Sequence, residues 1–199
     1  MRYNRPMENN AREFITVVSG LPRSGTSMAM RMLEAGGMPI LTDRIRRPDD
    51  DNPKGYYEFE RVKRLKEDKA WLPDAVGKAV KIISFLLPEL PHTHSCRIVF
   101  LRRAMPEVLA SQRHMLIRRG ESAEADDDAQ MAQVYAKHLK QVEAWIAAQP
   151  WVQALYLEHR AIIDHPAAAA TAMNAFLGGG LDAAAMAASV DATLYRQRA

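Results

Sequence analysis

A short glycine-containing segment near the N-terminus has the composition of an anion-binding loop. It reads Gly20-Leu-Pro-Arg-Ser-Gly25-Thr26-Ser27, and its two glycines have the spacing of a Walker A phosphate loop. The β-branched run before it, residues 15–19, predicts a buried strand, and the strong helix formers from Thr26 onward predict a helix. The N–H groups of such a loop and the positive end of the helix dipole attract an anion. The segment therefore predicts an oxyanion site between a strand and a helix.

The lysine of the Walker loop is absent. Thr26 stands where that lysine would be, and the cation of the loop is Arg23, three residues earlier. A kinase or triphosphatase needs the lysine on its β and γ phosphates, beside a magnesium ion. A planar guanidinium instead suits a clamp with two parallel hydrogen bonds to an oxyanion. A P-loop kinase is therefore the weaker alternative.

The loop and a second segment resemble the sulfotransferase family. The family's 5′-phosphosulfate loop reads P-[KR]-S-G-T-[ST], which Pro22-Arg23-Ser24-Gly25-Thr26-Ser27 matches at every position. After its third strand the family has an arginine and, eight residues on, a serine that hold the 3′-phosphate of PAPS (3′-phosphoadenosine 5′-phosphosulfate). In IVFLRRAMPEVLAS these positions fall on Arg103 and Ser111. An arginine at a strand end and a serine two turns into the next helix can both reach one anion.

Weaker matches extend this resemblance to bacterial sulfotransferases over about residues 15–198. They are NPKGYYE (residues 52–58) and LEHRAIIDHP followed by AFLG near the C-terminus. The resemblance implies an α/β, three-layer P-loop fold, with a four- to five-stranded parallel sheet flanked by helices and the strand order 2-3-1-4. The residues it assigns to PAPS are Pro22, Arg23, Ser24, Gly25, Thr26, Ser27, Arg103 and Ser111. Arg196, in the terminal LYRQR, is a further candidate for the nucleotide, with a frayed terminus as the alternative.

The segment that carries the catalytic histidine in cytosolic members of the family is different in this chain. Those members carry a histidine after the second strand, in a Lys-Thr-His setting, where this chain reads Val80-Lys81-Ile82-Ile83-Ser84. Lys81 matches the lysine of that setting, and the resemblance implies that it steadies the sulfuryl group or the leaving oxygen. Golgi-type relatives use a glutamate between the first helix and the second strand, and Glu58 is the best-placed candidate, with Glu60 behind it. We expect Glu58 to act as general base and Arg23 and Lys81 to stabilise charge, without a metal.

The rest of the chain predicts strands that alternate with helices, as in a parallel sheet covered on both faces. Further strands are expected at residues 79–83, 96–101 and 151–157. Helices are expected over residues 58–72 and 106–118, from the last aspartates of ESAEADDD through Trp145, over 164–177, and in a short stretch from Asp182. A long irregular loop at residues 38–57 carries Arg44, Arg46 and Arg47, which we expect to be solvated or to contact a ligand.

Composition limits the classes of function. The 199 residues, 48% hydrophobic and 26% charged, predict one globular domain over residues 1–199. A lone cysteine, Cys96, and the absence of a signal peptide favour the cytoplasm, and no apolar run is long enough to span a membrane. A net charge of only +3 argues against nucleic-acid binding. The histidines look typical of helix faces, caps or the surface: His114, His138, His159 and His165.

The expected reaction transfers a sulfuryl group from PAPS to a hydroxyl or amine of a small-molecule or glycan acceptor. Its nucleotide product is 3′-phosphoadenosine 5′-phosphate. The missing histidine and the short chain favour one alternative, a PAPS-binding domain that has lost catalysis. The methionines and alanines on the helices would permit a homodimer.

Overall fold

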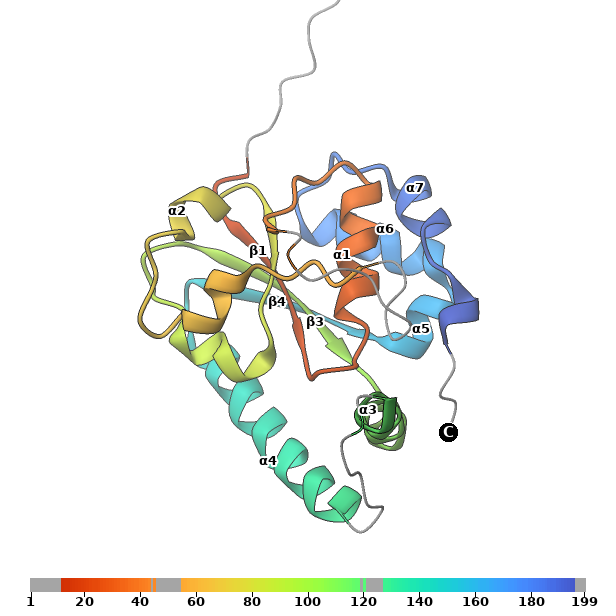
Figure 1. The fold of residues 1–199 in the computed structure, drawn as a ribbon. Coiled ribbons are helices and arrows are strands. Elements are labelled where there is room, and N and C mark those ends of the chain that lie inside the picture. The colour runs from red at the N-terminus through yellow and green to blue at the C-terminus, as the bar shows by residue number, and fades with distance from the viewer. Residues whose placement is uncertain (1–11, 44, 46–54, 119, 121–126, 196–199) are drawn as a thin grey trace, which may run out of the picture.

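Four parallel strands form the centre of the protein (Figure 1). This computed structural model describes residues 12–43, 45, 55–118, 120 and 127–195. The strands are β1 (Ile15–Gly20), β2 (Ala79–Lys81), β3 (Cys96–Arg102) and β4 (Val152–Glu158), in the order β2-β1-β3-β4. All three pairings between them are parallel, which confirms the predicted α/β class.

Helices cover both faces of the sheet, giving three layers (Figure 1). One face carries α1 (Thr26–Ala35), α5 (His159–Asp164), α6 (Pro166–Phe176) and α7 (Ala183–Ala188), and the other carries the 3-10 helices η1 (Glu60–Arg64) and η2 (Ser84–Glu89), α2 (Leu72–Ala75) and α4 (Asp127–Ala148). Successive strand residues point to opposite faces, so Val18 of β1 joins the core under α1 and Val17 joins the core under α2. Because helices cover both faces, every residue of β1 is buried.

The predicted strand order 2-3-1-4 is wrong. Strand β1 lies between β2 and β3, with Val18 opposite Lys81 on one side and Val99 on the other. Both β1 and β3 are mostly apolar and mostly buried, so the composition of each strand fits either of the two inner positions. Only the pairing between distant segments shows which of the two lies beside β2. As a result, the carboxyl end of β1 is flanked by the end of β2 and by the end of β3.

The predicted helix over residues 58–72 is also wrong in extent. The structure has only η1 and, after a turn, the short α2. The Asp68 carboxylate accepts hydrogen bonds from Arg61 and from the Ala70 N–H, and such local bonds compete with helix geometry. Trp71, fully buried, packs edge-to-face on Phe59 and holds the turn.

The other helices confirm the predictions to within a few residues. The helix α3 (Met105–Arg118) leaves the carboxyl end of β3, and α4 spans the predicted long helix. The alanine-rich helix begins at Pro166, and α5 before it was not predicted. A short 3-10 helix, η3 (Ala192–Leu194), leads to Tyr195. None of the described helices is both long and apolar enough to cross a membrane.

Candidate functional site

The loop between β1 and α1 has the backbone of an anion cradle. Arg23 and Gly25 adopt left-handed conformations, with φ of 67° and 100°. A Cβ on Gly25 would lie 2.6 Å from Cδ2 of His159, so glycine is needed for space as well as for φ. Gly25 is also the N-cap of α1 and has no side chain to bind the first N–H groups of the helix. The loop therefore presents backbone donors that an anion can satisfy.

A cavity of about 580 Å³ opens over this loop. It lies at the carboxyl edge of the sheet, where open α/β folds bind ligands. The cavity wall brings together most of the residues predicted for the site: Pro22, Arg23, Gly25, Thr26, Ser27, Glu58, Lys81, Arg103 and Ser111. Ser24 is the exception among the described residues, because its buried side chain is not part of this wall. Arg196, Arg44, Arg46 and Arg47 lie outside the described residues.

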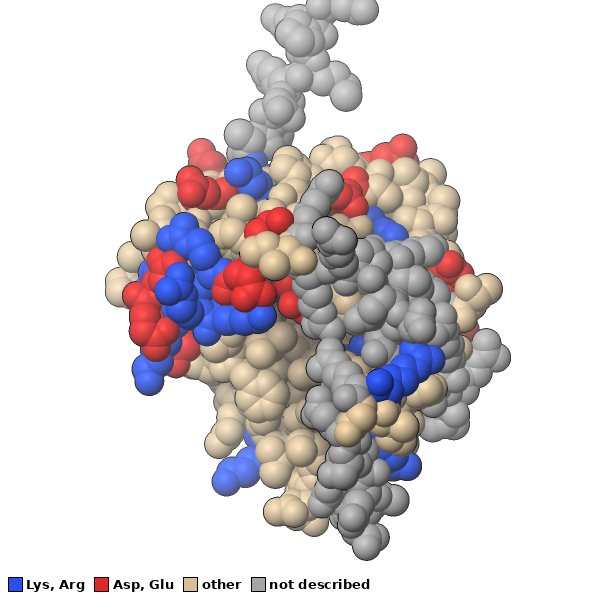
Figure 2. Space-filling view, viewed as in Figure 1, with Lys and Arg blue, Asp and Glu red and all other residues tan. Residues whose placement is uncertain are grey.

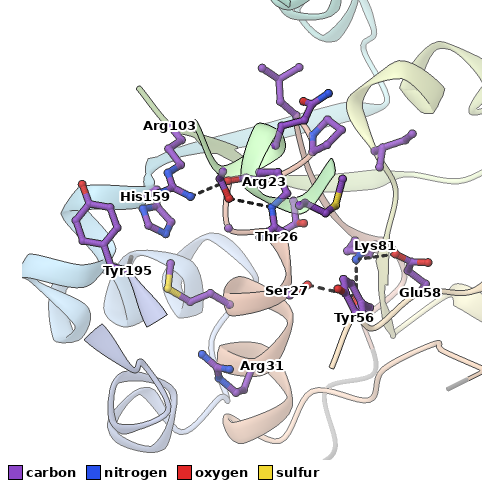
Figure 3. Close-up of a pocket in the computed structure, with 18 of the residues that line it drawn as sticks. Arg23, Thr26, Ser27, Arg31, Tyr56, Glu58, Lys81, Arg103, His159 and Tyr195 are labelled. Carbon is purple, nitrogen blue, oxygen red and sulfur yellow. Dashed lines mark hydrogen bonds and ion pairs between the residues drawn. The ribbon is translucent and has the colours of Figure 1, made fainter. Parts of the chain in front are cut away.

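One side of the cavity links the loop to β3 and α3 (Figure 3). Arg23 Nε donates a hydrogen bond to Ser111 Oγ at 3.0 Å, and Arg103 Nη1 donates one to the Arg23 carbonyl oxygen at 3.0 Å. The two segments predicted to hold anionic groups are thus in direct contact. The central place of β1, beside β3, makes this contact possible.

Arg103 also belongs to a nearly buried ion pair. Its Nε lies 2.8 Å from Glu107 Oε2, and the two side chains are 9% and 8% exposed. Tyr195 donates its hydroxyl hydrogen to the other oxygen of Glu107. Burial tends to raise the pKa of Glu107, but the hydrogen bonds from Tyr195 and Arg103 outweigh it and the pKa is lowered. The carboxylate therefore holds the Arg103 guanidinium at the cavity.

The opposite side of the cavity holds a lysine and a glutamate. Lys81, at the end of β2, has a side chain only 8% exposed, and its Nζ lies 3.8 Å from Glu58 Oε1. Nζ also donates a hydrogen bond to the carbonyl oxygen of Tyr56, which Ser27 Oγ approaches at 3.4 Å (Figure 3). Tyr57 takes a left-handed conformation, with φ of 53°, which bends the chain between Tyr56 and Glu58. A carboxylate and a buried ammonium group thus face the loop at residues 20–27 across one cavity.

Two solved structures with a similar fold are sulfotransferase domains. The sulfotransferase domain from the Synechococcus PCC 7002 olefin synthase superposes with a TM-score of 0.54 at 14% identity, covering 96% of this chain and 82% of that one. The chain has the fold of a sulfotransferase domain. The sulfotransferase domain from the curacin biosynthetic pathway superposes with the same TM-score and identity, covering 93% of this chain and 90% of that one. Neither protein-family models nor curated protein sequences give a match.

Within this sulfotransferase fold, His159 lies at the site although the sequence did not predict it there. It was expected to be an ordinary helix or surface histidine, but it is 7% exposed and on the cavity wall. Burial, and then the positive charge of Arg103, lower its pKa to about 4, against a smaller opposing effect of Glu107. A signal was available: His159 directly follows β4, as Arg103 follows β3, and residues at strand carboxyl ends line such sites.

The low pKa of His159 predicts a pH-dependent stability. In the unfolded chain the imidazole titrates near its usual 6.5, so between that value and about 4 the unfolded state binds more protons. The stabilisation is present above pH 6.5 and is lost as the pH falls towards 4. We expect the unfolding free energy to drop by roughly 2 kcal/mol from this group between about pH 7.5 and 5, measured by urea denaturation. His159→Gln should lack this component, whereas His165→Gln should keep it. Equal pH slopes in both variants would contradict the assignment.

Charges on the flank over η1 and α2 are mixed. In Figure 2 the flank over η1 and α2 carries Lys, Arg, Asp and Glu side chains side by side. Ion pairs there include Arg61 with Asp68 and Lys63 with Glu60. On this flank of the described residues, charges of both signs offset one another. Among the described residues, no group of three or more His, Cys, Asp or Glu side chains could hold a metal ion.

Proposed function

We propose that this protein binds PAPS and transfers its sulfuryl group to a hydroxyl or amine of an acceptor. One observation carries the proposal: the loop at residues 20–27, the contacts of Arg23 with Ser111 and with Arg103, and the Lys81–Glu58 pair all face one cavity. The sulfotransferase fold supports it.

The donor would lie along the loop and the Arg103 side of the cavity. The loop amides, Thr26 and Ser27 would hold the 5′-phosphosulfate, and Arg103 and Ser111 would hold the 3′-phosphate. Arg23, which bonds Ser111 from within the loop, would sit between the two anionic groups. Glu107 would keep Arg103 oriented for this contact.

The transfer exchanges one bond at sulfur for another. The bond from sulfur to the bridging oxygen of the 5′-phosphate breaks, and a bond from sulfur to the acceptor oxygen or nitrogen forms. Glu58 would take the proton of the acceptor, and Lys81 and Arg23 would stabilise the charge that develops on the leaving oxygen. Such loose in-line transfers depend mainly on positioning and charge stabilisation. The second product is 3′-phosphoadenosine 5′-phosphate.

The acceptor would be a small molecule or a glycan, and the protein would act as a single domain in the cytoplasm. The cavity wall also includes apolar side chains, among them Phe59, Val62 and Leu86. They would cover the apolar part of an acceptor near the base.

Calorimetric titration tests the donor. We expect 3′-phosphoadenosine 5′-phosphate to bind without metal and Arg23→Ala and Arg103→Ala each to weaken it at least about tenfold, because each removes a charge-assisted hydrogen bond worth roughly 1.5–3 kcal/mol. Arg102→Ala is the matched control, since Arg102 pairs with Glu143 at 2.7 Å and stacks on Tyr156, away from the cavity. Binding of ATP with magnesium but not of the bisphosphate would refute the proposal in favour of a kinase. Donor binding without turnover would indicate a domain that has lost catalysis.

A further inference from the structure

His159 occupies a position that touches the anion loop. It is the first residue of α5, at the carboxyl end of β4, and β4 lies next to β3, which ends at Arg102. A Cβ on Gly25 would lie 2.6 Å from Cδ2 and 3.5 Å from Nε2, so the Cδ2–Nε2 edge of the ring faces the loop. Figure 3 shows the ring between the loop, Arg103 and Tyr195. An anion held by the loop therefore has an imidazole as its neighbour.

The imidazole is incompletely satisfied. Its Nδ1 is buried and has no hydrogen-bond partner among the described residues, although its ring packs edge-to-face on Tyr195 at a centroid distance of 5.2 Å. Nδ1 lies on the far side of the ring from the Cδ2–Nε2 edge that faces the loop, so an anion held by the loop would meet Nε2 and not Nδ1.

The charged groups that face His159 are of opposite sign, and the effect of Arg103 is the larger. Arg103 and Glu107 face it from the β3–α3 side and form an ion pair, and Tyr195 faces it from the C-terminal segment. Arg160, next on α5, pairs with Asp164. A nucleotide 3′,5′-bisphosphate brings about three to four negative charges at neutral pH. One more positive charge beside the loop would offset part of them.

We propose that His159 binds the anionic part of the nucleotide as an imidazolium, so that bisphosphate binding takes up one proton from the buffer at this side chain. This inference rests on the proposed function. Before binding, the imidazole is neutral at pH 7, because burial and Arg103 lower its pKa to about 4. An opposite charge about 4–6 Å away typically raises a histidine pKa by about 1 to 3. The nucleotide complex would then titrate at about pH 5–7.

Calorimetry of 3′-phosphoadenosine 5′-phosphate in two buffers of very different ionisation enthalpy, matched in pH and ionic strength, measures the protons exchanged. At pH 5.5 we expect the unmodified protein to take up a substantial fraction of a proton more than His159→Gln. For a bound pKa near 6, its affinity relative to that variant should rise about fourfold from pH 8 to 5.5. His165→Gln, altered at the exposed N-cap of α6, should behave like the unmodified protein.

The outcomes separate this inference from the function on which it rests. Tight bisphosphate binding with the same proton uptake in His159→Gln would overturn the histidine assignment and leave PAPS binding intact. Absence of bisphosphate binding at every pH would overturn both. If His159→Gln does not fold, NMR titration of the histidine ring protons of the unmodified protein decides. One histidine pKa must rise on adding the bisphosphate, and a spectrum in which none rises refutes the proposal.

Discussion

Replacing Arg23 with alanine should lower the rate of sulfuryl transfer at saturating donor by roughly 10²-fold or more. Arg23 belongs to the loop and lines the cavity, and its Nε donates a hydrogen bond to Ser111 of α3. A hydrogen-bond donor aimed at the charge that develops in the transition state typically lowers the activation barrier by a few kcal/mol. The measurement is single-turnover transfer with the nucleotide donor in excess.

Two controls separate chemistry from folding in this experiment. Arg23 has a left-handed φ of 67°, which costs a non-glycine residue roughly 1–2 kcal/mol, and alanine inherits that cost without adding to it. Arg23→Lys keeps the charge and loses the planar fork, so an intermediate rate is expected. Arg102→Ala should leave the rate unchanged. A rate for Arg23→Ala equal to that of Arg102→Ala would remove Arg23 from the mechanism.

Replacing Glu58 with glutamine should reduce turnover by roughly 10²- to 10⁴-fold and leave the affinity for 3′-phosphoadenosine 5′-phosphate unchanged. The amide fills the same space but cannot take the acceptor's proton. Glu58 lies on the Lys81 side of the cavity, whereas the donor contacts are proposed on the Arg103 side. The loss should therefore appear in the chemical step.

Glu60→Gln is the matched control for this variant. Glu60 is two residues away, pairs with Lys63 at 2.6 Å, and is not part of the cavity wall. We expect its turnover to match that of the unmodified protein. Full activity in Glu58→Gln would assign the base elsewhere, and equal losses in both variants would indicate damage to the η1 segment.

Local features of this chain were predictable because short stretches of sequence determine them. The β-branched run before Gly20 and the helix formers after Gly25 specify strand, turn and helix, and the glycines permit the positive φ that the loop needs. The α/β class follows from alternation of such elements. Asp182 starts a helix because its side chain accepts the N–H of Ala185, as its position in the sequence predicts.

Features that depend on neighbouring charges or side chains were less predictable. The helix expected over residues 58–72 gave way to a turn held by Asp68 and Trp71, since one ion pair and one buried ring outweigh a weak local propensity. Glu107 and Tyr195 look ordinary in the sequence, yet together they orient Arg103. The hydrogen bond from Tyr195 to Glu107 joins residues 88 positions apart, so no pattern within a short stretch of sequence predicts it.

The sequence by itself determined the glycine-containing loop between β1 and α1 and the alternation of strands and helices that makes a parallel sheet. The tertiary structure decided that β1 pairs with β2 on one side and β3 on the other, and so placed the loop between Lys81 and Arg103. It also placed His159 against Gly25 by ending β4 beside β3. The physical reason is that strand pairing joins apolar segments through backbone hydrogen bonds that any of them can make. Their order depends on packing across the whole chain.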